Sequence, residues 1–80
     1  MRRAAFESRM SFATAMNRLQ PERADYWAGY MRGLRRAFHG RAFGTDAEHR
    51  LWLSLIGRED SQGRERGLGY RDGLTGKEVL

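Results

Sequence analysis

Apolar residues recur at helical spacing through most of the chain. Between about Ala4 and Leu19 they are separated by four, three and three positions and form one stripe, consisting of Phe6, Met10, Ala13 and Met16. This spacing is that of an amphipathic helix. Gln20-Pro21 is expected to end this first helix, because proline is tolerated in a first turn but not in a helix interior.

A second helix is predicted from Pro21 to about His39. Glu22 and Asp25 follow the proline, where carboxylates suit the positive end of the helix dipole. Its apolar face is continuous and comprises Ala24, Trp27, Ala28, Met31, Leu34 and Phe38. Gly40 is expected to end the helix in the left-handed conformation. Residues 40–44 are then predicted to form a short loop that Phe43 anchors in the core.

Two further helices are predicted in the second half. Thr45-Asp46-Ala47-Glu48 has the pattern of a capping box, so the third helix starts at Thr45 and stops at Gly57. Its apolar residues are Leu51, Trp52, Leu55 and Ile56. Residues 59–61 form another acidic start, and a fourth helix is predicted from about Ser61 to Leu74, with Gly76 as its end. No segment alternates with the period of a strand.

A six-residue phrase occurs twice, at residues 29–34 and 69–74, forty positions apart. Each copy reads Gly-Tyr-x-x-Gly-Leu. A spacing of four places both glycines on one helix face, and such a bare strip allows another helix to come close. We therefore predict that Gly29 and Gly33 face Gly69 and Gly73 about a local twofold axis. The alternative is that each strip packs on a different partner, including a second copy of the chain.

Length and composition define the class of protein. Eighty residues form one domain, residues 1–80, with a single small core. The expected fold class is all-α, a compact bundle of about four short helices in which the second and fourth cross at their glycine strips. The chain has no cysteine and no apolar run approaching the ~20 residues of a membrane span, so we expect a soluble cytoplasmic protein without disulfides.

The chemistry of a catalytic or metal site is missing from the pattern. His39 and His49 lie on different predicted helices, without carboxylates at metal-ligand spacing, and are interpreted as capping or surface residues. The serines lack a nucleophile elbow, and the glycines lack the context of a phosphate loop. We expect no catalytic residue, no cofactor and no metal, and hence no enzyme.

Positive charge is concentrated in the first half. Residues 1–44 carry nine arginines and three acidic residues, whereas residues 45–80 carry six basic and seven acidic residues. A basic ridge is predicted along the outer side of the second helix, formed by Arg32, Arg35, Arg36 and His39, with Arg41 just beyond. The alternative is an ordinary solvated helix face, and the preference for arginine also fits codon bias in a GC-rich genome.

The string around the first repeat carries a resemblance. Tyr26-Trp27-Ala28-Gly29-Tyr30 is followed by Arg32-Gly33-Leu34-Arg35-Arg36, His39-Gly40, Phe43-Gly44-Thr45 and Glu48-His49, and is closed by residues 69–74. Over residues 23–76 this pattern resembles small proteins of phages and integrative elements in GC-rich bacteria, a group similar to anti-CRISPR proteins that act on type I systems. The resemblance implies a small inhibitor that binds a Cas subunit or the surveillance complex and blocks DNA binding or nuclease recruitment without catalysis.

The contact surface is predicted from residue types and not from the resemblance. Arginine, tyrosine and tryptophan dominate many protein interfaces, and the second helix contains all three. The surface is assigned to Arg32, Arg35, Arg36 and Arg41, joined by whichever of Tyr26, Tyr30 and Tyr70 stays exposed. The partner is expected to be a protein, inside the bacterial host. The alternative is a small basic phage regulator that binds nucleic acid with the same ridge, and the oligomeric state is left open.

Overall fold

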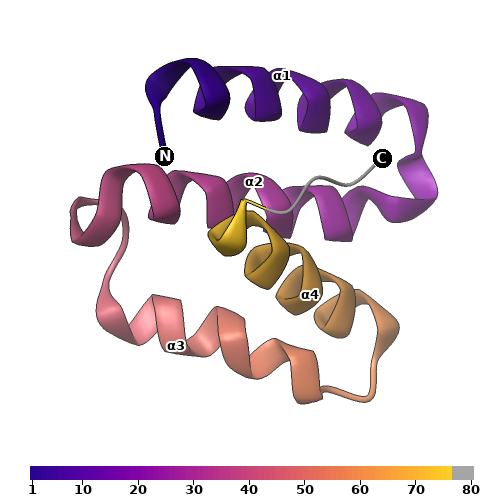
Figure 1. Cartoon of the computed structure of the whole chain (residues 1–80). Coiled ribbons are helices and arrows are strands. Elements are labelled where there is room, and N and C mark those ends of the chain that lie inside the picture. The colour runs from indigo at the N-terminus through magenta and orange to yellow at the C-terminus, as the bar shows by residue number, and fades with distance from the viewer. Residues whose placement is uncertain (77–80) are drawn as a thin grey trace.

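The computed structural model describes residues 1–76, and these form an all-α fold with four α-helices (Figure 1). Short 3₁₀ turns, labelled η, join them. The elements are α1 (Arg3–Leu19), η1 (Pro21–Arg23), α2 (Ala24–His39), η2 (Gly40–Ala42), α3 (Asp46–Ser54), η3 (Leu55–Gly57) and α4 (Ser61–Thr75). The predicted four-helix bundle is confirmed.

The connections differ from the prediction in detail. Pro21–Arg23 is a separate 3₁₀ turn, because the Ala24 amide bonds to the Pro21 carbonyl before the α-helical pattern of α2 starts. Gly40 does end α2 with a positive φ of 65°, but its ψ of −143° lies outside the left-handed helical region. The expected loop after it contains the turn η2. Phe43 is half-buried and lies beside the His39 ring and the Arg32 guanidinium, away from the central core.

The start of α3 uses half of the predicted capping box. The Thr45 hydroxyl accepts a hydrogen bond of 3.0 Å from the Glu48 amide, which satisfies one free N–H of the first turn. The Glu48 carboxylate, however, accepts a bond of 2.7 Å from Arg32 of α2. The Glu48 side chain, which was expected to cap its own helix, therefore connects α3 to α2 instead.

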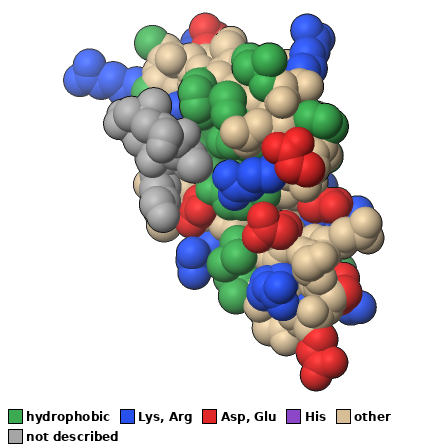
Figure 2. Space-filling model, turned by 90° about the vertical axis from the view of Figure 1, so that its right-hand side faces the viewer, with side chains coloured by type: hydrophobic (Ala, Val, Ile, Leu, Met, Phe, Trp, Pro, Cys, Tyr) green, Lys and Arg blue, Asp and Glu red, His purple; other side chains and the backbone are tan. Residues whose placement is uncertain are grey.

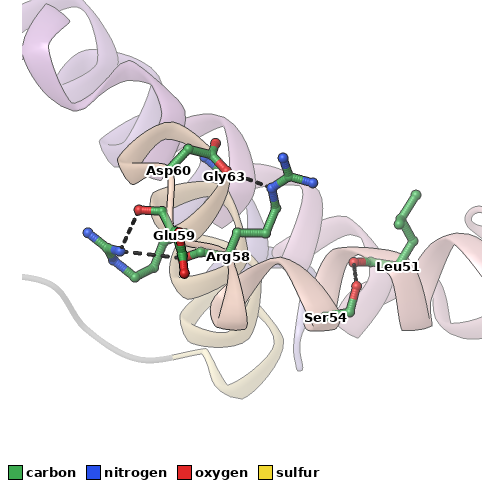
Figure 3. Close-up of polar contacts among 7 residues, drawn as sticks. Leu51, Ser54, Arg58, Glu59, Asp60 and Gly63 are labelled. Atoms are coloured by element: carbon green, nitrogen blue, oxygen red, sulfur yellow. Dashed lines mark hydrogen bonds and ion pairs between the residues drawn. The ribbon is translucent and has the colours of Figure 1, made fainter.

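The start of α4 is fixed by a cluster of short polar contacts (Figure 3). Asp60 accepts from the Gly63 amide at 2.8 Å and from Arg58 Nε at 2.6 Å. These two donors hold the pKa of Asp60 below its ordinary value, with Arg58 as the larger cause. At the far end of the helix, Gly76 adopts the predicted left-handed conformation with φ 66° and ψ 26°. Both ends of this glycine-rich helix are thus capped.

The predicted crossing of α2 and α4 is the centre of the fold. An added Cβ at Gly29 would collide with the Arg66 carbonyl, and one at Gly69 with the Tyr26 carbonyl. In the same way Gly33 lies against the Tyr70 carbonyl and Gly73 against the Tyr30 carbonyl. Each pair is related by the forty-residue repeat, so the local twofold arrangement is confirmed.

This register also gives the direction and chemistry of the crossing. Gly29 meets residues 66–70 and Gly33 meets residues 70–74, so the two helices run the same general way. A glycine hydrogen occupies each place where a side chain would collide with a carbonyl oxygen, the geometry of weak Cα–H···O contacts. Close approach therefore compensates for the roughly 1 kcal/mol that each glycine costs within a helix.

The outer helices flank this pair. α1 packs on α2 through the predicted stripe and covers a core of Ala13, Tyr26, Trp27, Tyr30 and Leu34. On the other side, α3 and η3 pack against α4, and η3 approaches Gly67 so closely that a Cβ there would overlap the Ile56 backbone. The result is a thin slab of 35 × 31 × 15 Å (Figure 1).

Candidate binding surface

The predicted basic ridge divides into two pairs with different roles. Arg32 and Arg36 turn toward α3 and hold it. Arg32 bonds to Glu48 at 2.7 Å and lies over the Trp52 ring. Arg36, whose side chain is only 11 % exposed, bonds to Asp46 at 3.0 Å and to the Phe43 carbonyl at 3.1 Å. The side chains of Arg32 and Arg36 are thus engaged in contacts within the fold.

Arg35 and Arg41 remain at the surface. Both are exposed, and neither forms a salt bridge with another residue in the range 1–76. Arg35 lies on the side of α2 that faces away from the glycine crossing, and Arg41 lies in η2. Of the four arginines assigned to the contact surface, these two are free to meet a partner.

All three candidate tyrosines are core residues. Tyr26, Tyr30 and Tyr70 are at most 4 % exposed. Two of them flank the glycines of the repeat, and a residue next to the crossing is covered by the facing helix. The condition that a tyrosine stays exposed is met by none of them, and these rings are removed from the contact surface.

Tyr26 instead forms a buried polar pair with Asp72 of α4. Its hydroxyl donates to Asp72 Oδ2 at 2.6 Å, and Asp72 is 7 % exposed. Burial, followed by the bond to this carboxylate, raises the pKa of Tyr26 well above its ordinary value. The Arg23 guanidinium lies 4.3 Å from the centre of the Tyr26 ring. The pair orients α4 on α2.

Tyr70 pairs with His49 of α3. The hydroxyl lies 2.6 Å from His49 Nδ1, and burial raises the pKa of Tyr70. His49 is half-buried, so its interpretation as a capping or surface residue gives way to a structural role. This bond and the two arginine contacts attach α3 together with the half-buried Trp52 ring, whose centre lies 5.7 Å from that of Tyr70. No residue of α3 is fully buried.

The opposite end of the slab carries mixed charge. Figure 2 faces this end and shows acidic and basic side chains next to one another. Arg66 pairs with Asp25 at 2.8 Å, and Arg23 lies 3.9 Å from Glu65. An open groove of about 300 Å³ lies here, and its lining consists of Pro21, Glu22, Arg23, Asp25, Tyr26, Ser61, Gln62 and Glu65.

Within residues 1–76, no three or more His, Asp or Glu side chains gather in a way that could hold a metal ion. None of the helices in this range combines the length and the apolar character needed to cross a bilayer.

Comparison with known proteins gives no relative for this geometry. No protein-family model matches the chain, and no curated protein or solved structure is significantly similar to it.

Sequence reasoning missed two polar residues that the structure uses. Asp72 occupies a variable position of the second repeat, and no role was predicted for it. Its position three residues after Gly69 places it beside the crossing face. His49 follows the capping residue Glu48 and is 21 residues from its partner Tyr70. No local signal predicts a bond between two helices whose relative position depends on the whole fold.

Proposed function

We propose that this chain is a non-catalytic inhibitor that works by binding a protein. The partner implied by the resemblance is a Cas subunit or an assembled type I surveillance complex in the bacterial cytoplasm. Binding there would block DNA binding or nuclease recruitment. The observation that supports a docking role is the exposure of Arg35 and Arg41, which form no ion pair with residues 1–76.

A rigid scaffold suits such a role. The interlocked backbones of α2 and α4 leave little freedom between the helices, so a partner would lose little energy in ordering them. A standard protein interface buries about 800 Å² on each side. The chain exposes 5142 Å² in total, so an interface of that size would use a substantial part of one face.

An interference assay tests the proposal. Bacteria that target a phage with type I systems of several subtypes would express the chain, and plaques would be counted. We expect the wild-type chain to restore plaques in at least one subtype and to co-purify with its surveillance complex. A failure to protect phage in every subtype, with no complex bound, would contradict the proposal.

Two double variants identify the surface in the same assay. Arg35→Glu with Arg41→Glu should abolish protection, because both arginines are exposed and form no salt bridge within residues 1–76. Arg18→Glu with Arg64→Glu makes the same change in net charge at other exposed positions and should preserve protection. Arg36 is left unchanged, since its replacement would disturb α3.

A basic regulator that binds nucleic acid is the competing outcome. Binding to random DNA, measured by fluorescence anisotropy at about 50 and 200 mM salt, would then fall by orders of magnitude between the two conditions. A shape-matched protein interface depends on salt more gently.

A further inference from the structure

The excess positive charge of the molecule lies almost entirely at one end. We infer that this end, defined below and called the basic end, docks on a carboxylate-rich protein surface. The inference rests on the proposed function in that the partner is a protein. It adds where the partner binds and which chemical groups it presents.

Three elements meet at the basic end. Figure 1 shows the start of α1, the end of α2 and the start of α3 on the same side of the slab. The exposed arginines of these segments, together with η2, define the basic end: Arg2, Arg3, Arg35, Arg41 and Arg50. Only two of them belonged to the ridge predicted from the sequence.

Ring contacts hold the first two elements together. The Phe6 ring of α1 stacks on the Phe38 ring of α2 with centres 4.4 Å apart. The Arg3 guanidinium lies 5.6 Å from the Phe38 ring centre, and the exposed His39 meets the same ring edge-on at 5.0 Å. The Arg3 guanidinium of α1 and the His39 ring of α2 thus contact the same aromatic ring.

The charge balance is strongly one-sided. With the α3-bound Arg32 and Arg36 included, this side holds seven arginines against three carboxylates, those of Glu7, Asp46 and Glu48, which is an excess of four positive charges. The opposite end holds five arginines and five carboxylates: Arg18, Arg23, Arg58, Arg64 and Arg66 with Glu22, Asp25, Glu59, Asp60 and Glu65. Its charges cancel, as the mixed colours of Figure 2 illustrate.

Asp46 indicates the kind of anion that suits the basic end. Its carboxylate is bonded to Arg36 and also feels the charges of Arg41 and Arg50, and these arginines hold its pKa below the ordinary value. Three guanidiniums around a single carboxylate leave positive charge uncompensated. A carboxylate supplied by another protein would meet the forked donors of the exposed Arg41 and Arg50, which form no salt bridge within residues 1–76.

A single-stranded nucleic acid fits this surface less well. Sequence-tolerant binding of single strands uses exposed aromatic rings on which bases stack. Here Phe6, Phe38 and Phe43 are half-buried and pack on one another, on His39 or under arginine side chains. Apart from the exposed His39 ring, which meets Phe38 edge-on, the accessible groups at this end are arginine side chains.

Binding to two labelled probes tests the inference. The probes are a peptide of about fifteen glutamates and a thymidine oligonucleotide of the same length, and fluorescence anisotropy reports their binding at low salt. We expect the wild-type chain to bind the peptide at least as tightly as the oligonucleotide. Arg35→Glu with Arg41→Glu should weaken peptide binding by at least about tenfold, and Arg18→Glu with Arg64→Glu by less than about threefold.

Three results would overturn the inference. Peptide binding could be undetectable, the two double variants could weaken it equally, or the oligonucleotide could bind about tenfold more tightly than the peptide. Unchanged thermal unfolding of each variant is required as a control for folding. The assay contains no CRISPR component, so its failure is distinct from a failure in the interference assay.

Discussion

Tyr26 and Asp72 connect two helices through a hydrogen bond between buried polar side chains. Among residues 1–76, removal of the Tyr26 hydroxyl leaves the Asp72 carboxylate with only a 3.4 Å side-chain contact to Arg71. Tyr26→Phe should therefore lower the free energy of unfolding by about 1–3 kcal/mol in urea titrations. Ser54→Ala, which removes an exposed hydroxyl, is the control and should change it by less than about 0.5 kcal/mol. Equal stability of Tyr26→Phe and wild type would contradict the role of the pair.

The two raised tyrosine pKa values predict a loss of stability at alkaline pH. In the unfolded chain the phenols ionise near pH 10, whereas in the folded chain Tyr26 and Tyr70 stay protonated to higher pH. Their contribution is complete below about pH 10 and falls above it, by up to about 1.4 kcal/mol per pH unit for each phenol. Urea titrations between about pH 8 and 11 measure the slope. Tyr26→Phe should flatten it, and an unchanged slope would contradict the assignment to Tyr26.

Single residues were the hardest level to predict from sequence. The glycines of the repeat were assigned correctly because their spacing has one geometric meaning on a helix. The tyrosines beside them were offered as contact residues, but whether a ring next to a crossing is covered depends on the facing helix. Asp72 and His49 gained their roles from partners 46 and 21 residues away.

At the scale of the elements, the crossing of α2 and α4 requires glycine at the positions of closest approach. A methyl group at Gly73 would collide with the Tyr30 carbonyl, which is backbone and cannot rotate away. Gly73→Ala should cost at least about 3 kcal/mol of unfolding free energy, a large share of the stability of a small domain.

Gly57 provides the matched control for that change. No heavy atom lies within 4 Å of an added Cβ at Gly57, and its φ is not positive. Gly57→Ala should therefore be neutral or stabilise the chain by up to about 1 kcal/mol. If both alanine variants unfold at the same urea concentration, the close crossing is wrong.

Two arginines that are adjacent in the sequence have different roles in the attachment of α3. Arg36→Ala removes bonds to Asp46 and to the Phe43 carbonyl and should lower the melting temperature by at least a few degrees. Arg35→Ala removes an exposed side chain and should leave the melting temperature unchanged. Circular dichroism at 222 nm follows both transitions. Equal melting of the two variants would contradict the division of the ridge.

Elements were predictable where local chemistry decides them. Thr45, Asp60 and Gly76 cap helices in the way that their residue types favour. The 3₁₀ turns η1, η2 and η3 were not predicted, because the exact ends of helices depend on neighbouring bonds. The third helix, expected to stop at Gly57, is α-helical only to Ser54 and continues as η3. The bond of the Glu48 carboxylate to Arg32, in place of the expected return contact to Thr45, depends on the position of α3 relative to α2.

At the scale of the whole molecule, the fold determines where the charged side chains lie, which the sequence alone does not show. The sequence shows a basic first half, but it does not show which arginines form salt bridges within the fold. Folding α3 back onto α2 occupies Arg32 and Arg36, and the pairing of α1 with α2 brings Arg3 to the same end as Arg35. The predicted ridge thereby becomes a basic end drawn from several elements.

The central claim is that the glycine crossing holds a scaffold with one uncompensated, carboxylate-binding end. A titration of the ¹⁵N-labelled chain with the glutamate peptide, followed by amide and arginine Nε chemical shifts, tests it most directly. We predict that the shifts gather at Arg3, Arg35, Arg41 and Arg50, while those of Arg18 and Arg58 stay unchanged. Shifts of equal size at both ends, or larger ones at Arg18 and Arg58, would contradict the account.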